Sequence, residues 1–317
     1  MTLATAVRGS WQQFLEAFEG LRPELYRYCR HLTRSPWDAE DLSQDVLARA
    51  FVTLGKQGAA PANPRAWLFR VASNTWIDAQ RRPRAAFEPA PSVELDPRDT
   101  REAAGTLISR LAPQERAAVV LKDVFDLSIE DIAAALSTTP NAVKAALHRG
   151  RGKLVEEAAG EHRVPTPAAL DAFVAGFEQR DLVAVTALLL DTATVEVVGV
   201  TTQYGKEGRI LWGMMFGSER LAEAATRGGI EAKFVQQALP TPPRREIRVH
   251  RGEPIVLAWY AHTDGEHVRA IDRVEVVGDH VARLRNYFFT PDVLAEVCAE
   301  LEVPVRSNGY KFWLEGG

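Results

Sequence analysis

Apolar residues return every three or four positions along the first part of the chain, as they do in helices with one buried face. This period holds from Trp11 to Arg84 in two groups: Phe14, Leu15, Phe18, Leu21 and Leu25, then Val46, Leu47, Ala50, Phe51 and Leu54. Asn63 and Pro64 form a favourable helix start, because Asn caps a helix and Pro is tolerated at its first position. We therefore predict an all-helical segment whose last helix runs over 63–82.

A second helical pattern covers about 105–158, and its centre is typical of a helix-turn-helix. Ser128 and Asp131 have the spacing of a capping box. The short helix that they begin should bury four apolar residues: Ile129, Ile132, Ala133 and Leu136. The polar turn at 137–139 follows, and Pro140 opens the next helix. Two short helices joined by such a turn predict a helix-turn-helix.

The second of these helices concentrates basic residues. Its inward positions should be Val143, Ala146, Leu147 and Leu154. Its outward positions near the N-terminal half, where a recognition helix meets base edges, are Asn141, Lys144, Ala145 and His148. Three more cations suit phosphates: Arg149, Arg151 and Lys153. A solvated basic face is the plainer interpretation. A membrane-surface helix is disfavoured, because the apolar face lacks large aromatic residues.

From residue 168 the pattern changes from helices to strands. Two helical stretches (168–180 and 182–190) lead into runs of β-branched and aromatic residues at 193–199, 246–250, 254–262, 267–277 and 280–289. Turn residues separate the later runs, which predicts an antiparallel meander. Helices followed by strands indicate an α+β domain.

Composition limits the class of protein. Net charge is −4, which argues against a protein that coats nucleic acid everywhere but leaves room for a local basic face. Cys29 and Cys298 are far apart, which suits a reducing compartment and gives no metal-ligand spacing. The longest apolar run, I-L-W-G-M-M-F-G, is far short of the ~20 residues of a membrane span. We expect a soluble, cytoplasmic protein with no membrane segment, cofactor or metal.

Two stretches of the sequence suggest a family. L-A-P-Q-E-R-A-A-V-V-L-K-D-V-F-D-L-S-I-E-D-I-A-A-A-L-S-T-T-P-N-A-V-K-A-A-L-H-R-G-R-G-K-L closely resembles region 4 of bacterial extracytoplasmic-function (ECF) sigma factors, which reads the −35 promoter element. The segments 38–51 and 63–82 resemble region 2 of these proteins. The resemblance covers about half of the chain. It implies a protein that is not an enzyme, binds core RNA polymerase and directs promoter-specific initiation of transcription.

The resemblance also implies a domain organisation and site residues. Region 2 should cover 10–84, a linker 85–104 and region 4 105–160. The −35 contacts would be the outward and phosphate-binding residues of the basic helix. The clamp helices of the largest polymerase subunits would bind an acidic ridge of Asp38, Glu40, Asp41, Gln44 and Asp45. The alternative, which stays open, is that these acids bind no partner and only stabilise the first turn of the helix through the helix dipole.

Segment 65–82 interleaves basic and aromatic residues, which is what melted single strands need. By resemblance it opens the −10 element, with contacts from Arg70, Asn74, Trp76, Arg81 and Arg82. Because apolar residues recur there at helical spacing, we expect Trp67 to be structural. Asp78 should fix a neighbouring arginine.

The last part resembles a SnoaL-like domain of the NTF2-like cone fold, expected over 166–292 with a tail over 293–317. In relatives with this extension the domain is thought to regulate in cis. A small-molecule pocket could be formed by Trp212, Trp259, Asp272, Tyr287 and Phe289. The plainer alternative is that the four aromatic side chains only fill the interior of the cone.

Strand alternation places Asp272 on one face with four apolar residues: Val268, Ala270, Val274 and Val276. There the carboxylate could act as a base, pair with Arg285 or lie at the open rim of the cone. Two other functions stay open. One is a polymerase-independent helix-turn-helix regulator with a ligand-sensing domain, and the other is a cone-fold enzyme with a DNA-binding appendage.

Overall fold

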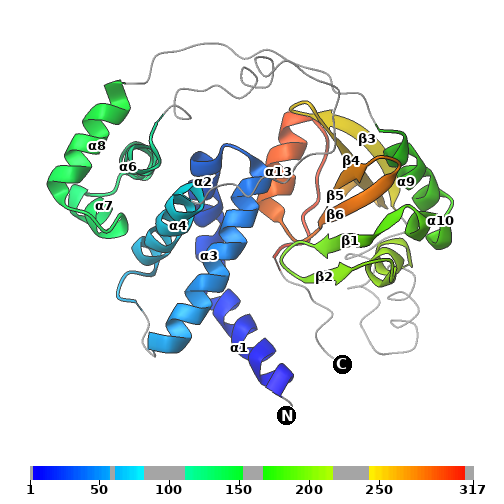
Figure 1. Ribbon diagram of the computed structural model, residues 1–317, viewed down its shortest axis with the longest axis horizontal. Helices are drawn as coiled ribbons and strands as arrows, with labels where there is room; N and C mark the ends of the chain where they lie inside the picture. The colour runs from blue at the N-terminus through cyan, green and yellow to red at the C-terminus, as the bar shows by residue number, and fades with distance from the viewer. Residues whose placement is uncertain (1–2, 58–60, 82–110, 153–166, 217–242, 311–317) are drawn as a thin grey trace. The chain divides into compact units, whose positions relative to one another are not determined.

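Two units make up the chain, residues 1–160 and residues 161–317. The computed structural model describes residues 3–57, 61–81, 111–152, 167–216 and 243–310. The described part of the first unit is helical, and the second unit combines helices with a sheet (Figure 1). The expected multidomain class, two helical parts followed by an α+β part, is confirmed.

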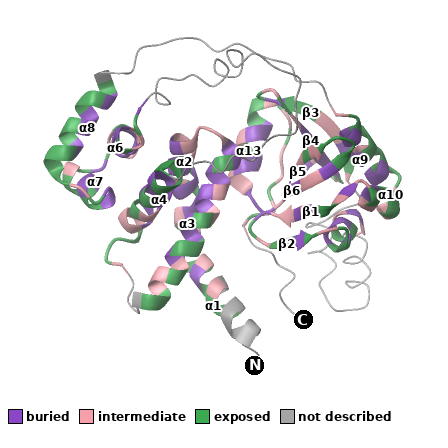
Figure 2. Ribbon diagram, viewed as in Figure 1, coloured by how far each residue is buried: buried purple, intermediate pink, exposed green. Residues whose placement is uncertain are grey.

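The first unit begins with α1 (Leu3–Phe18), a 3-10 turn (Glu19–Leu21), α2 (Arg22–Thr33), α3 (Pro36–Gln57) and α4 (Pro64–Arg81). Asn63 caps α4 as predicted, since its side-chain oxygen accepts the Ala66 backbone N–H at 3.0 Å. A buried hydrogen bond of 2.7 Å joins the Tyr28 hydroxyl on α2 to the Ser73 hydroxyl on α4. Each of α2, α3 and α4 carries a run of buried residues along its length (Figure 2).

The second helical group packs on the first through two of its helices and the loop that joins them. The group comprises α6 (Pro113–Asp123), α7 (Ile129–Ala135) and α8 (Pro140–Gly152). In the loop after α6, the Phe125 ring lies 5.0 Å from the Phe69 ring of α4 and 5.7 Å from the Tyr28 ring, centroid to centroid. On α6, Arg116 donates from its guanidinium to the Leu32 carbonyl at 2.7 Å.

In the second unit, α9 (Ala168–Glu178) and α10 (Leu182–Ala187) precede a six-stranded sheet of order β2-β1-β6-β5-β4-β3. The strands are β1 (Leu189–Val197), β2 (Thr201–Tyr204), β3 (Arg244–His250), β4 (Glu253–His262), β5 (Gly265–Val277) and β6 (His280–Tyr287). Residues 209–216 are helical. The meander from β3 to β6 is antiparallel as predicted.

Outside this meander, β1 pairs in parallel with β6, so the sheet as a whole is mixed. The helix expected over 182–190 ends at Ala187, and the apolar Leu189 and Leu190 open β1 instead. A short apolar run fits either element, so its period could not decide between them.

A β-bulge changes which residues share a face of the sheet. Ala258 of β4 pairs with Ala270, but Trp259 pairs with Val268, so Arg269 has no partner on β4. Cross-strand pairs point to the same face, and the side chains of successive strand residues alternate. Val268 therefore lies on the face of Trp259, opposite Ala270, which corrects the alternation expected around Asp272.

The residues expected as a tail from 293 belong to the α+β unit. The helix α13 (Pro291–Glu300) and α9 lie on opposite sides of the sheet (Figure 1). Beyond α13, the Val268 backbone N–H donates to the Pro304 carbonyl at 2.9 Å, and Arg306 N–H donates to the Val268 carbonyl at 3.0 Å. The Asn308 amide donates to the carbonyls of Arg269 and Phe288, each at 2.9 Å.

Candidate nucleic-acid interface

The pair α7 and α8 forms the predicted helix-turn-helix. The Ser128 oxygen accepts the Asp131 backbone N–H at 3.0 Å, and the Ser128 hydroxyl donates to the Asp131 carboxylate at 2.7 Å, which confirms the helix cap. Thr139 caps α8 through its hydroxyl oxygen, which accepts the Ala142 N–H at 3.2 Å, and Pro140 follows at the first helical position. Local cap chemistry therefore fixes both helix starts.

The two faces of α8 are those predicted from its period. Val143, Ala146 and Leu147 are buried. The four positions expected to meet base edges are all exposed: Asn141, Lys144, Ala145 and His148. Leu154 and Lys153 lie outside the described residues. The exposed face of α8 can thus offer an amide, an ammonium and an imidazole to base edges.

Both described arginines near the end of α8 are held by carboxylates of α6. The Arg149 side chain is 58% exposed, and its Nε donates to Glu115 Oε1 at 3.0 Å. Arg151 binds Asp123 through two nitrogens. Hydrogen bonding to Asp123 and the charge of this carboxylate raise the pKa of Arg151, against a small effect of burial. These pairs were missed from the sequence, because Glu115 and Arg149 are 34 residues apart.

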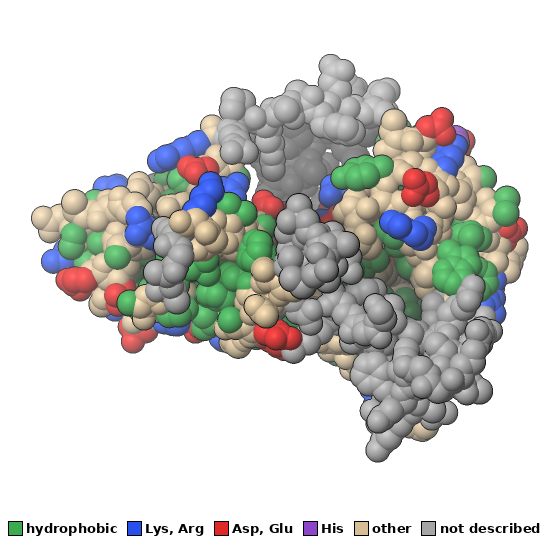
Figure 3. All heavy atoms as spheres, turned by 90° about the horizontal axis from the view of Figure 1, so that it is seen from below, with side chains coloured by type: hydrophobic (Ala, Val, Ile, Leu, Met, Phe, Trp, Pro, Cys, Tyr) green, Lys and Arg blue, Asp and Glu red, His purple; other side chains and the backbone are tan. Residues whose placement is uncertain are grey.

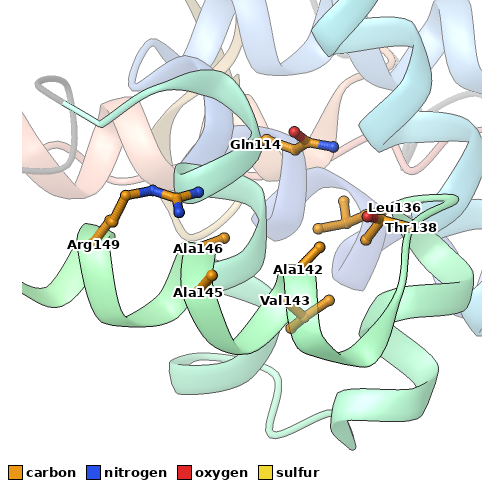
Figure 4. A pocket seen from close by; sticks show the side chains of 8 residues that line it. All are labelled: Gln114, Leu136, Thr138, Ala142, Val143, Ala145, Ala146 and Arg149. Carbon is orange, nitrogen blue, oxygen red and sulfur yellow. The ribbon is translucent and has the colours of Figure 1, made fainter.

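A pocket of about 270 Å³ lies beside this face (Figure 4). Its lining comes from α8, the preceding turn and the start of α6: Gln114, Leu136, Thr138, Ala142, Val143, Ala145, Ala146 and Arg149. Basic and acidic side chains are intermixed on the face of the described residues in Figure 3. On α8 itself the described Lys and Arg side chains are Lys144, Arg149 and Arg151, and both arginines are paired with carboxylates of α6, so a DNA-binding role depends on a few placed cations rather than on a broad positive field.

On α4, three of the residues expected at the −10 element form one exposed stripe. Arg70, Asn74 and Arg81 are spaced by four and by seven positions, which puts them on the same side of a helix. Asp78 lies 3.9 Å from Arg81, as expected for a residue that fixes a neighbouring arginine. Arg82 lies outside the described residues.

Trp76 does not belong to this stripe. Its side chain is 4% exposed, and the Arg116 guanidinium carbon of α6 lies 5.2 Å from the centre of its ring. In this arrangement the ring is not available to stack on a base. A signal was present in the sequence: Phe69, Ala72 and Trp76 are spaced by three and four, so Trp76 lies on the core face. Trp67 is half-buried against Phe18, with ring centroids 6.1 Å apart, as a structural residue would be.

The acidic ridge of α3 is narrower than expected. Asp38, Asp41 and Asp45 recur every three or four positions, and none of them is buried. Glu40 is 2% exposed, and its carboxylate accepts the Gln44 side-chain amide at 2.6 Å. The surface open to a partner is thus the three aspartates with Gln44, whereas Glu40 points into the helical core.

In the second unit, Asp272 is fully buried in an ion-paired cluster. The Arg245 guanidinium binds one of its oxygens, and the Asn286 amide donates to the other at 2.6 Å. The guanidinium carbon of Arg245 also lies 3.9 Å from the Phe177 ring centre. The expected partner Arg285 instead donates to Glu196 at 2.9 Å. A carboxylate held by a cation and an amide is a structural group rather than a poised base.

The five expected pocket residues do not meet. Asp272 pairs with Asn286, and Ile271 pairs with Tyr287, so Tyr287 lies on the opposite face from Asp272. Trp259 also lies opposite Ala258 and Ala270, the neighbours of Asp272 on its face. Trp212 is 37% exposed beside Phe216, and Phe289 follows β6. The structure therefore corrects the expectation of one cavity lined by all five.

None of the helices in the described parts of the chain is both long enough and apolar enough to cross a membrane. Among the same residues, no group of three or more His, Cys, Asp or Glu side chains is arranged to hold a metal ion.

Comparison with known proteins supplies the family. Residues 17–86 match the family model of sigma-70 region 2, and residues 101–154 match that of sigma-70 region 4. The RNA polymerase sigma-E factor of Streptomyces coelicolor is 33% identical over 159 residues, which cover 47% of this chain and 88% of that protein. The chain belongs to the ECF sigma factors.

Two other similar sigma factors match over a larger share of this chain. The ECF RNA polymerase sigma factor SigG of Mycobacterium tuberculosis is 28% identical over 240 residues. The match covers 62% of this chain and 64% of the length of SigG, which is less than two thirds of that relative. The crystal structure of the M. tuberculosis extracytoplasmic function sigma factor SigJ is 22% identical with a TM-score of 0.32, covering 88% of this chain and 98% of that one.

The residues matched by the two family models include the surfaces described above. The region 2 match contains the α3 aspartates and the α4 stripe, and the region 4 match contains α6, α7 and α8. The α+β unit follows both. Its helices α9 and α10 precede the sheet and α9 packs on one face of it, which agrees with the α+β domain expected there.

Proposed function

We propose that this sigma factor binds core RNA polymerase and directs promoter-specific initiation of transcription. The observation that carries the proposal is the pair of exposed surfaces within one chain, the α4 stripe in the region 2 match and the outer face of α8 in the region 4 match. A regulator that acts without polymerase needs only the second surface. The protein would work in the cytoplasm, where polymerase and promoters are.

At the −10 element, Arg70 and Arg81 would neutralise phosphates of the melted strand, and Asn74 would hydrogen-bond an exposed base. Stacking on an aromatic ring contributes ~1–3 kcal/mol per base, so Trp76 would add to this once Arg116 has left its ring. Arg82 stays a prediction. At the −35 element, Asn141, Lys144, Ala145 and His148 would meet base edges in the major groove. Arg149, Arg151 and Lys153 would bind phosphates.

Core polymerase would dock on α3. Asp38, Asp41 and Asp45 form an acidic line that suits a basic surface, and Gln44 adds an amide beside it. The clamp helices of the largest subunits are the partner proposed for this line.

The α+β domain would regulate initiation in cis and perform no chemistry. Its central carboxylate, Asp272, is already neutralised by Arg245. A small-molecule ligand for this domain stays a prediction.

The test is transcription in vitro by bacterial core polymerase on a pool of templates with randomised promoter sequences. The full chain should yield promoter-dependent transcripts. Asp41→Lys should reduce them to background, because it reverses the charge in the middle of the acidic line. Asp279→Lys makes the same reversal in the exposed turn between β5 and β6 and should transcribe like the wild type. Absence of transcripts from the wild type would refute the proposal.

A second arm tests regulation in cis. The chain ending at residue 160, the boundary of the first unit, should differ from the full chain in transcript yield under the same conditions. Equal yields from the two chains would leave the α+β domain without a regulatory role in initiation.

A further inference from the structure

The two arginines of α8 are held from either side of a close helix crossing. At the crossing, a Cβ added to Gly150 would lie 2.8 Å from Val119 Cγ2, closer than side-chain atoms normally approach. Gly150 therefore lets α8 approach α6 closely. Arg149 and Arg151 flank this glycine, and each binds a different carboxylate of α6.

Glu115 is a buried acid with two tasks. Its side chain is 6% exposed. Oε2 accepts the Ala112 backbone N–H at 3.2 Å, which caps α6, while Oε1 accepts Arg149 Nε at 3.0 Å. A buried carboxylate requires such partners, since an isolated one would be strongly destabilising. The Arg149 side chain, in contrast, is more than half exposed.

The geometry of each pair uses only part of the guanidinium fork. Arginine carries five N–H donors in a fixed plane. Glu115 takes the Nε–H of Arg149, and Asp123 takes Nε–H and one terminal nitrogen of Arg151. A guanidinium fixed at its Nε edge keeps its orientation while terminal donors can still meet an anion.

We propose that Glu115 and Asp123 are positioning residues, which hold Arg149 and Arg151 in the orientation that binds two DNA phosphates. The inference rests on the proposed function of α8 as a DNA-contacting helix. It assigns α6 a part in DNA binding that α6 carries out without touching DNA.

The direction of the change in DNA affinity distinguishes a positioning role of these acids from a purely electrostatic one. Removal of an acid near DNA ordinarily strengthens binding, because repulsion from phosphates is lost. Loss of a positioning acid weakens binding instead, even though the protein becomes more positive. Glu115→Gln is the cleanest change, because glutamine at this helix position can still accept the Ala112 N–H.

The experiment measures binding of the full chain to a 30-base-pair duplex of random sequence by fluorescence anisotropy, at several salt concentrations. Glu115→Gln should bind roughly threefold to tenfold more weakly. Its log–log salt dependence should be shallower by about 0.9, the value of one phosphate contact. Arg149→Ala combined with Glu115→Gln should bind within about twofold of Arg149→Ala alone, because the two changes remove one contact.

Three controls separate a loss of positioning from a change of net charge and from unfolding. Glu130→Gln removes the same charge from the exposed side of α7 and should bind as tightly as the wild type or more tightly. Asp123→Asn changes a carboxylate that is 37% exposed, so it should weaken binding without the risk of unfolding a buried site. Circular dichroism melting confirms that each variant is folded.

Tighter or unchanged binding by both Glu115→Gln and Asp123→Asn, with the salt dependence of the wild type, would overturn the inference and leave α8 as a DNA-binding helix. A wild-type chain that binds no duplex even at low salt would overturn the DNA-binding role itself, and the inference with it.

Discussion

Removal of the Phe125 ring should loosen the contact between the two helical groups and uncover Trp76. Phe125 is half-buried between the Phe69 and Tyr28 rings, at 5.0 and 5.7 Å, and the Arg65 guanidinium carbon lies 6.0 Å from its centre. Two aromatic pairs at ~0.5–1.5 kcal/mol each and a distant cation–π contact of ~0.5 kcal/mol sum to about 2 kcal/mol. Such a loss shifts the equilibrium toward separation by roughly 30-fold.

The assay is binding of the full chain to a fluorescent single-stranded oligonucleotide. Because Arg116 on α6 would leave the Trp76 ring when the groups separate, Phe125→Ala should bind the strand more tightly, by up to about 30-fold. Val124→Ala, at the neighbouring position that is 49% exposed, should bind like the wild type. The gain should disappear when Trp76→Ala is added to Phe125→Ala. Unchanged or weaker binding by Phe125→Ala would refute the idea that this contact keeps the Trp76 ring from binding single-stranded DNA.

Three further predictions concern stability. Ser128→Ala removes the cap of α7 and should lower the free energy of unfolding of the first unit by ~1 kcal/mol in urea titrations; no change would mean that the cap is dispensable. Asp272→Ala leaves Arg245 buried without its carboxylate and should cost ~3–5 kcal/mol in the second unit, with a loss below ~1 kcal/mol counting against the ion pair. Burial lowers the pKa of His250, although Glu300 opposes this shift. Below pH ~6.5 the unfolded chain therefore takes up a proton that the folded chain resists, and stability should fall from pH 7.5 to 5.5. His250→Gln should flatten that dependence in thermal melts, and an equally steep profile would contradict the assignment.

Features fixed by neighbouring residues could be predicted from the sequence. The cap at Ser128, the start of α4 at Asn63 and the inward face of α8 at Val143 follow from contacts within a few residues, and the structure confirms each. The meander from β3 to β6 is also local, since each strand pairs with the next along the chain.

Features that depend on distant partners could not be predicted. Asp272 is neutralised by Arg245, 27 residues away, and Arg149 by Glu115, 34 residues away. The contact of Arg116 with the Trp76 ring depends on how α6 packs, although the local period already places Trp76 on the core face of α4. The bulge at Arg269 reverses the face of Val268, because one extra residue in a strand shifts the alternation.

The parallel pairing of β1 with β6 has a consequence for the order in which the protein forms during synthesis. Glu196 on β1 bonds Arg285 on β6, 89 residues later, and the Val268 region of β5 is completed only by Pro304 and Arg306. The ribosome must therefore release nearly the whole α+β domain before its sheet can close, whereas the first 160 residues can fold as soon as they emerge. If the domain restrains the sigma factor in cis, each new molecule passes through an interval in which it is folded for transcription but not yet restrained. That interval would lengthen wherever translation slows in the second half of the message.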